Sequence, residues 1–159
     1  MSSRGKYQLV SESPIGPLGI SIINGCVCGV DFLDRRTKPI ASDDPMALET
    51  QRQLQSYFQN GSNQFSLPLE LLGTDFQKRV WQALARIGQG DVRTYGEVAN
   101  ELNTSPRAVG NACRSNPVPL IIPCHRVVSA HGIGGFAGAT AGRRVDIKRW
   151  LLLHEGVCL

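Results

Sequence analysis

Two capping boxes constrain the fold of this chain most strongly, because they fix where helices begin in its second half. Thr74 is followed three residues later by Gln77, and Thr94 by Glu97. In this motif the Thr hydroxyl and the later side chain each accept a hydrogen bond from the other residue's backbone N–H. Ser105 precedes a proline, which suits the first position of a further helix. The sequence therefore predicts three successive helices, each with a defined start.

The second and third of these helices are short and lie close together in sequence. The second ends near Leu102, and a tight turn separates it from the helix that Ser105 starts. Two short helices joined in this way form a helix-turn-helix, although any helical hairpin shows the same pattern. The third helix carries Arg107 at its start and the small residues Ala108 and Gly110 along it. Small side chains let a helix approach a narrow groove, which favours a minor-groove interface.

The first part of the chain predicts an antiparallel sheet. Apolar residues alternate from Leu18 to Ile22, and Asn24 with Gly25 forms a strong hairpin signal. On the return strand Cys26 and Cys28 share one face, which we expect to pack in the core. A zinc site would require two more ligands, which no nearby residue supplies.

A helix from Pro45 to about Asn60 follows the sheet, with its apolar residues at helical spacing. The predicted fold class is therefore α/β (α+β). A small N-terminal domain of sheet plus helix, residues 1–72, precedes a mostly helical domain with the helix-turn-helix, residues 73–159.

Charge is distributed unevenly between these two parts. Residues 1–73 carry 6 Lys and Arg against 7 Asp and Glu, whereas residues 74–159 carry 11 against 6. No carboxylate lies between Glu101 and Asp146, an interval that holds five arginines. This pattern predicts a surface that faces phosphates. The five are Arg107, Arg114, Arg126, Arg143 and Arg144.

Cysteine usage and hydropathy predict a cytoplasmic protein. Five cysteines without disulfide-like spacing indicate a reducing compartment. The apolar runs are too short to span a bilayer, and the first residues lack the apolar segment of a secretory signal. We expect no membrane association.

One short segment combines a thiol with an imidazole in a rigid frame. Apolar residues flank it on both sides, and Pro123 restricts the backbone next to Cys124. A neighbouring His lowers the pKa of a thiol, so Cys124 beside His125 is a candidate nucleophile. On this pair alone, a buried structural cysteine is equally plausible.

The segment from Pro123 to Val127 resembles the active-site signature of the O6-alkylguanine-DNA alkyltransferases, and the similarity extends from Gly73 to Gly156. The resemblance implies that Cys124 attacks the alkyl carbon and keeps the alkyl group, so each molecule reacts once. His125 would take the thiol proton through a water, and Glu155 would orient His125. Asn116 would tie the helix-turn-helix to the cysteine segment.

The same resemblance implies how the substrate is held. The third helix would lie in the minor groove, with Arg107 filling the gap left by a base rotated out of the stack. Tyr95 would donate a hydrogen bond to the departing base. Backbone groups of Cys124 and Val127 would read the guanine edge, and the Ala137 N–H would face O6.

The remaining residues follow from the same motif positions. The DNA-binding residues implied are Thr94, Tyr95, Ser105, Arg107, Ala108, Gly110 and Arg114. The pocket residues implied are Tyr95, Pro119, Val127, Phe136, Ala137 and Lys148. The chain departs from the family in having Phe136 where a Tyr is usual, and in a longer segment from Ala139 to Asp146.

The predicted substrate is double-stranded DNA bearing O6-alkylguanine, with O4-alkylthymine left open. We expect no cofactor or metal, because no nucleotide loop or ligand cluster occurs. We further expect a monomer, with cooperativity on DNA open, in a bacterial-type cytoplasm and at the nucleoid. A lesion-binding protein without activity is one alternative, although such proteins lack the cysteine. A cysteine hydrolase is a second, but adjacent Cys and His suit its geometry poorly. A helix-turn-helix regulator would leave the cysteine segment unexplained.

Overall fold

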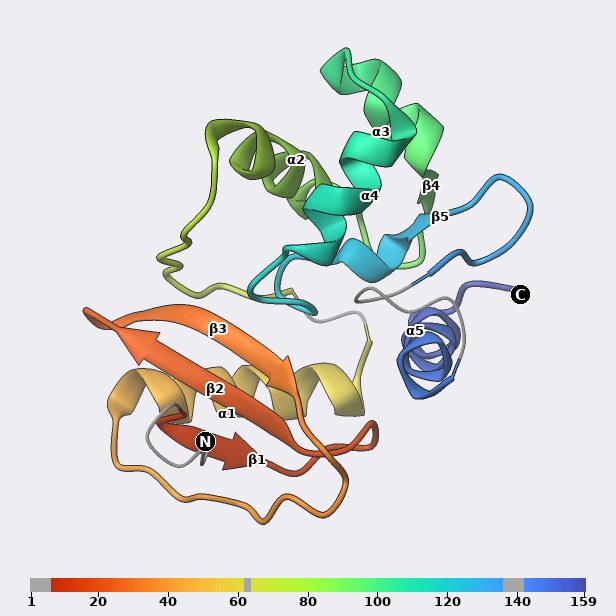
Figure 1. Ribbon diagram of the computed structural model, residues 1–159. Helices are drawn as coiled ribbons and strands as arrows, with labels where there is room; N and C mark the ends of the chain where they lie inside the picture. Colours follow the sequence, from red (N-terminus) through yellow and green to blue (C-terminus); the bar gives the residue numbers. More distant parts are fainter. Residues whose placement is uncertain (1–6, 62–63, 136–141) are drawn as a thin grey trace. The chain divides into compact units, whose positions relative to one another are not determined.

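The computed structural model describes residues 7–61, 64–135 and 142–159 (Figure 1). The chain forms two compact units, residues 1–72 and residues 73–159. The first contains a sheet and one helix, and the second is mostly helical, which confirms the predicted fold class. No helix in the described part is long and apolar enough to cross a membrane.

The first unit is built on the predicted hairpin. Strands β1 (Leu9–Ser11), β2 (Leu18–Ile23) and β3 (Cys26–Phe32) form an antiparallel sheet in that order. Asn24 and Gly25 have φ angles of 52° and 71°, the left-handed conformation that a tight hairpin turn requires. The turn residues therefore fix the pairing of β2 with β3.

The expectation that Cys26 and Cys28 pack in the core is wrong. Val27 is fully buried, whereas both cysteines are half-buried. Ser21 pairs with Gly29 but Ile22 pairs with Val27, so the register shifts and Cys28 is an extra residue in β3. Because a bulge exchanges the faces of the residues beyond it, strict alternation fails here.

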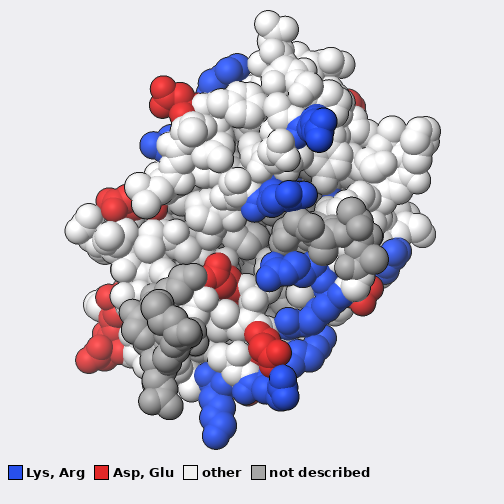
Figure 2. All heavy atoms as spheres, viewed as in Figure 1, with Lys and Arg blue, Asp and Glu red and all other residues white. Residues whose placement is uncertain are grey.

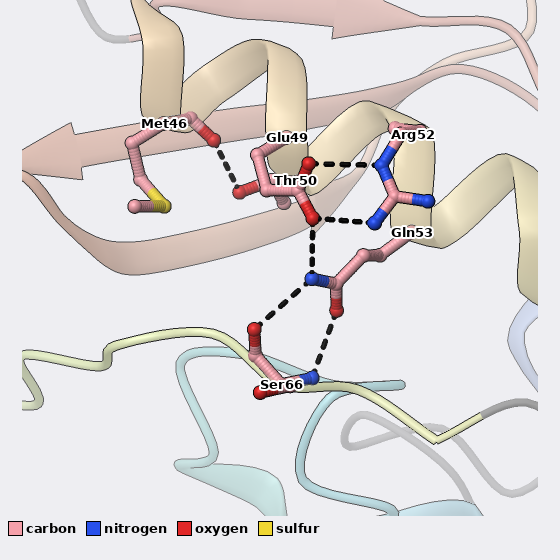
Figure 3. A network of polar contacts seen from close by, with 6 residues as sticks. All are labelled: Met46, Glu49, Thr50, Arg52, Gln53 and Ser66. Atoms are coloured by element: carbon pink, nitrogen blue, oxygen red, sulfur yellow. Dashed lines mark hydrogen bonds and ion pairs between the residues drawn. The ribbon is translucent and has the colours of Figure 1, made fainter.

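Helix α1 (Pro45–Gln59) packs against the sheet through Ala47, Leu54 and Tyr57. Asp44 caps the helix, with Oδ1 accepting hydrogen bonds of 2.9 Å from two backbone N–H groups. The side-chain amide of Gln53 in α1 exchanges hydrogen bonds of 2.8 and 3.0 Å with the backbone of Ser66, which lies beyond the end of the helix (Figure 3). This contact fixes the segment after α1 to the helix.

Two helices of the second unit begin at the predicted capping boxes. Thr74 caps α2 (Asp75–Ala85), and Thr94 caps α3 (Tyr95–Leu102), with both reciprocal hydrogen bonds formed at each start. Ser105 caps α4 (Pro106–Arg114), and Asn103 between the last two helices is left-handed, with a φ of 58°. The predicted helix-turn-helix is therefore α3 and α4.

A short parallel pairing brings α3 next to the cysteine segment. Strand β4 (Arg93–Thr94) pairs with β5 (Val127–Val128). Since β4 leads directly into α3 and β5 follows the 3₁₀ turn η2 (Cys124–Arg126), this pairing places Tyr95 close to the cysteine turn. Helix α5 (Arg143–His154) also packs against η2.

The core of the second unit holds the helix-turn-helix rigidly. Val80 and Leu84 of α2, Val109 of α4 and Leu151 of α5 are fully buried. The indole N–H of the buried Trp81 donates a 2.9 Å hydrogen bond to a backbone carbonyl of α4. Helix α4 is therefore anchored to α2 by packing and by a directed bond.

Candidate active site

Cys124 begins a single turn of 3₁₀ helix and is 7% exposed. Its N–H donates to the Ile122 carbonyl at 2.8 Å, and the Arg126 N–H donates to the Pro123 carbonyl at 3.0 Å. Leu120 shortly before the turn has a φ of 77°, which is rare for a branched residue. The backbone that presents the thiol is thus fixed by hydrogen bonds and apolar packing.

His125 and Glu155 are in direct contact, as the resemblance implied. Both side chains are completely buried, and His125 Nε2 lies 2.7 Å from Glu155 Oε2. A carboxylate oxygen can only accept, so Nε2 carries the proton and Nδ1 is the basic nitrogen of the neutral ring. Nδ1 is buried and has no hydrogen-bond partner among the described residues. The ring is therefore held in the tautomer that can take up a proton at Nδ1.

Arg126 holds the other side of the Glu155 carboxylate. Its Nε donates to Oε1 at 2.8 Å and its Nη2 to Oε2 at 3.1 Å, while Nη1 donates to the Ile87 carbonyl at 2.6 Å. The prediction that Arg126 faces phosphates is wrong, because its side chain is 9% exposed and pairs with a buried carboxylate. Sequence reasoning missed this role, although a Glu at a helix C-terminus needs a compensating cation.

Without substrate, burial favours the uncharged forms of the Cys124 thiol and the His125 imidazole. Burial raises the pKa of the Cys124 thiol, while Asn116 and the charge of Lys148 lower it. Burial also lowers the pKa of His125, against the raising effect of Glu155. The resting site therefore holds a neutral thiol and a neutral imidazole at neutral pH, and the lowered pKa of Cys124 that the sequence predicted from the neighbouring His is wrong.

Asn116 connects two segments, as the resemblance implied. Its Nδ2 donates to the Ile122 carbonyl at 2.8 Å, and its Oδ1 accepts from the Val118 N–H at 3.0 Å. The amide thus spans the loop between α4 and the cysteine turn. Pro119 in this loop is buried.

Lys148 is a fully buried amine close to Tyr95. Its Nζ donates to the Val127 carbonyl at 2.7 Å and to the Gly135 carbonyl at 2.9 Å, and lies 5.8 Å from the Tyr95 ring centroid. Burial lowers the pKa of Lys148 to about 8. This side chain ties Val127 and Gly135 to α5, and with them the glycine-rich segment that includes Gly132, Gly134 and Gly135.

The phenol of Tyr95 lies between α4 and the glycine-rich segment. A Cβ at Gly110 would be 3.9 Å from its ring, and a Cβ at Gly134 would be 3.2 Å from it. Burial, then the charges of Cys113 and Cys124, raise the pKa of Tyr95 to about 12. Sequence reasoning missed Cys113, whose pKa is raised to about 12 by burial and by Cys124. The sequence did carry a signal for Cys113, because it lies three residues after Gly110 and therefore on the same face of the helix.

The residues assigned to DNA binding lie on α3 and α4. Arg107 and Arg114 are exposed, and Tyr95, Ala108 and Gly110 are half-buried. The hydroxyls of Thr94 and Ser105 accept the capping hydrogen bonds of the two helices, each at 3.1 Å. Figure 2 shows one face of the molecule, on which Lys and Arg side chains gather in the region of α5.

Two predicted pocket residues, Phe136 and Ala137, lie outside the described residues. Within the described ranges no group of three or more His, Cys, Asp or Glu side chains is placed to hold a metal ion.

Comparison with known proteins identifies the family. Residues 75–157 match the model of the 6-O-methylguanine DNA methyltransferase, DNA binding domain. A methylated-DNA–protein-cysteine methyltransferase from Methanosarcina acetivorans is 38% identical, over 96% of this chain and 99% of the relative. Another from Sulfolobus acidocaldarius is 37% identical, over 93% of this chain and 92% of the relative.

Solved structures agree with this assignment. The O6-methylguanine methyltransferase of Mycobacterium tuberculosis is 36% identical with a TM-score of 0.78, over 92% of this chain and 90% of that one. The same protein in complex with DNA gives a TM-score of 0.76 with the same identity and coverage. The chain therefore belongs to the 6-O-methylguanine DNA methyltransferase family.

Proposed function

We propose that this protein repairs DNA by transferring the methyl group of O6-methylguanine to its own Cys124. The observation that carries the assignment is the buried series of Cys124, His125 and Glu155. Nε2 of the imidazole is hydrogen-bonded to the Glu155 carboxylate at 2.7 Å, and Nδ1 has no hydrogen-bond partner among the described residues. The membership of the chain in the family supports the reaction.

In the proposed step, His125 Nδ1 accepts the proton of the Cys124 thiol, and the sulfur attacks the methyl carbon in line with the bond to O6. The new C–S bond forms as the C–O6 bond breaks, and the electron pair of that bond remains on guanine. The anionic base then takes up one proton and His125 releases the one that it accepted, so the proton of Cys124 is balanced and the repaired guanine stays in the DNA strand. A thioether is not hydrolysed in water, so each molecule reacts once.

Tyr95 suits the role of donor to the departing base. Its pKa of about 12 keeps the phenol protonated at neutral pH, and a hydrogen bond to an anionic base is stronger than one to a neutral base. Lys148 adds a positive charge close by, which lowers the pKa of Cys124. These two groups stabilise negative charge as it moves from sulfur to guanine.

We propose that duplex DNA is engaged by α4 in the minor groove. The target carbon lies in the base stack, so the nucleotide must rotate out at a cost of about a few kcal/mol. Arg107 is exposed at the start of α4, where it can fill the gap, and the half-buried Ala108 and Gly110 present little bulk. Other DNA-binding residues we propose are Thr94, Ser105 and Arg114. We expect the protein to act as a monomer at the nucleoid of the cytoplasm.

The retained Cys124 favours transfer over lesion binding without reaction. The hydrolase alternative requires a second nucleophile, water, to attack a carbonyl adduct. The relatives of this chain are named for transfer to a protein cysteine and not for hydrolysis, which supports the repair reaction.

Intact mass after mixing with a duplex that contains one O6-methylguanine tests the proposal. We expect the mass of one methyl group to appear on the wild-type and Cys113→Ser proteins, in a one-to-one ratio with repaired DNA. The Cys124→Ser variant should bind the duplex but gain no mass. Tight binding by the wild type without any mass change would instead identify a lesion-binding protein.

A further inference from the structure

We propose that Arg126 is a positioning residue, which aligns the Glu155 carboxylate and holds His125 as a neutral base until Cys124 gives up its proton. This inference rests on the proposed function of Cys124 and His125. Arg126 contacts Glu155 and not the reacting atoms, so it acts through Glu155.

The geometry supports alignment. The guanidinium donates one hydrogen bond to each oxygen of Glu155, at 2.8 and 3.1 Å, and a third to the Ile87 carbonyl at 2.6 Å. Glu155 Oε2 also lies 2.7 Å from His125 Nε2, so one oxygen contacts both the imidazole and the guanidinium. Three bonds in a rigid plane fix the guanidinium, which in turn leaves the carboxylate one orientation.

The hydrogen bond to Ile87 also connects Arg126 to the segment that follows α2. Ile87 follows Arg86, the C-cap of α2, and its carbonyl accepts the 2.6 Å hydrogen bond from Arg126 Nη1. Arg126 therefore bonds the end of α2 and the end of α5 at once. A lysine could supply the charge but not the bidentate bond together with the contact to Ile87.

The charges around His125 support the second part of the proposal. The charged groups that face it are Glu155 and Lys148 from α5 and Arg126 from η2. Burial is the largest influence and lowers the pKa of His125; Glu155 raises it, and Arg126 and Lys148 lower it. Loss of Arg126 would remove one of the two cations that oppose the effect of Glu155, which would shift the balance towards the imidazolium. An imidazolium has no lone pair at Nδ1 and cannot accept the thiol proton.

The first experiment measures the titration of His125 by NMR in the wild type and in Arg126→Gln, without DNA. The chain has three histidines, so substitution of His131 and His154 in turn assigns the third signal. We expect Arg126→Gln to raise the His125 midpoint by about one unit or more. The Arg126→Lys variant should keep the wild-type midpoint, because it keeps the charge.

The second experiment measures the single-turnover rate of methyl transfer against pH. The acidic limb of the Arg126→Gln profile should move to higher pH by the same amount as the NMR midpoint, so that a deficit of about tenfold at pH values below both midpoints disappears at basic pH. The acidic limb of the Arg126→Lys profile should keep its wild-type position, because the charge is kept. The maximal rate of this variant should be lower, because a lysine cannot form the bidentate bond to Glu155. A role limited to folding would lower the rate at every pH and leave the limb unmoved.

An unchanged midpoint and limb in Arg126→Gln would overturn the proposal, as would an equal shift in Arg126→Lys. If the Gln variant does not fold, Arg126→Lys decides alone, since a raised midpoint there contradicts the expected charge effect. The NMR titration needs no reaction, and wild-type transfer is measured separately. Failure of the positioning role is therefore distinguishable from failure of the proposed function.

Discussion

At the scale of single residues, the site contains two buried cations with different partners. Arg126 faces a carboxylate, whereas Lys148 donates to two neutral carbonyls. A buried charge without a counterion is costly, which is why burial lowers the pKa of Lys148 from 10.5 to about 8. Lys148 is therefore the group whose charge changes just above neutral pH.

The first prediction concerns pH. Between about 8 and 10.5 the folded protein loses the Lys148 proton before the unfolded chain does, so this group makes stability rise with pH in that window. Transfer should change in the opposite direction, because loss of the charge raises the pKa of Cys124. We expect the single-turnover rate to fall above about pH 8, alongside a rising midpoint in urea denaturation between about pH 8 and 9, above which the raised pKa values of Cys113 and Cys124 act against the rise.

Two variants check this prediction. Lys148→Met should transfer about tenfold more slowly near neutral pH and lose the alkaline fall, since the charge is absent throughout. Lys148→Arg should show no alkaline fall, because a guanidinium stays charged. An alkaline fall that persists unchanged in both variants would assign it to another group.

The second prediction concerns the buried pair of Arg126 and Glu155. Glu155→Gln keeps the size of the side chain but leaves the guanidinium without its counterion. We expect a loss of about 3–5 kcal/mol in the free energy of unfolding, measured by urea denaturation. Arg86→Gln is the matched control, because it breaks a pair with Glu101 in which Arg86 is 65% exposed. It should cost about 1 kcal/mol or less, and equal losses in both variants would contradict the burial argument.

At the scale of helices and strands, the sequence predicts what depends on neighbours along the chain. The capping boxes at Thr74 and Thr94 and the hairpin at Asn24 each act within a few residues, and all three are present as predicted. The bulge at Cys28 depends on how β3 pairs with β2, so strand alternation could not reveal it. Local signals thus located the elements, but not the register of every strand.

The third prediction concerns Gly110 in α4. Alanine is the better helix former by about 0.8–1.0 kcal/mol, and the nearest atom to an added Cβ is 3.9 Å away, so Gly110→Ala should stabilise the fold. The methyl group would lie on the face of α4 that we propose enters the minor groove. We therefore expect a higher melting temperature but weaker binding to DNA.

Gly96→Ala in α3 is the matched control for this prediction. An added Cβ there would also meet only an ordinary contact, 3.8 Å from Thr94 Oγ1. The melting temperature should rise as in Gly110→Ala, whereas binding to a short duplex, followed by fluorescence anisotropy, should weaken less. Unchanged binding in Gly110→Ala would remove α4 from the proposed interface.

At the scale of the whole chain, the sequence predicted the residues of the site better than their environment. The spacing of Cys124 and Glu155 suggested a shared site only through the family resemblance, and the structure places Glu155 on His125. Burial, which raises the pKa of Cys124 and removes Arg126 from the surface, depends on the packing of α2, η2 and α5. No pattern in the local sequence encodes that packing.

The last prediction uses the uneven distribution of charge between the two units. Each Lys or Arg that neutralises a phosphate releases counterions, so the logarithm of the DNA affinity falls with the logarithm of the salt concentration by about 0.9 per contact. The exposed Arg107 and Arg114 belong to the proposed interface, and Arg35 and Arg36 of the first unit are exposed but outside it. Only the first pair should contribute to this slope.

Anisotropy titrations of undamaged duplex over a range of salt concentrations measure the slope directly. In undamaged duplex no base is rotated out, so Arg107 as well as Arg114 can neutralise a phosphate, and replacing both by Gln should reduce the slope by about 2. The double replacement of Arg35 and Arg36 removes the same net charge but should leave the slope unchanged. Since net charge is matched, an equal reduction in both would mean that the protein attracts DNA through its overall field and not through α4.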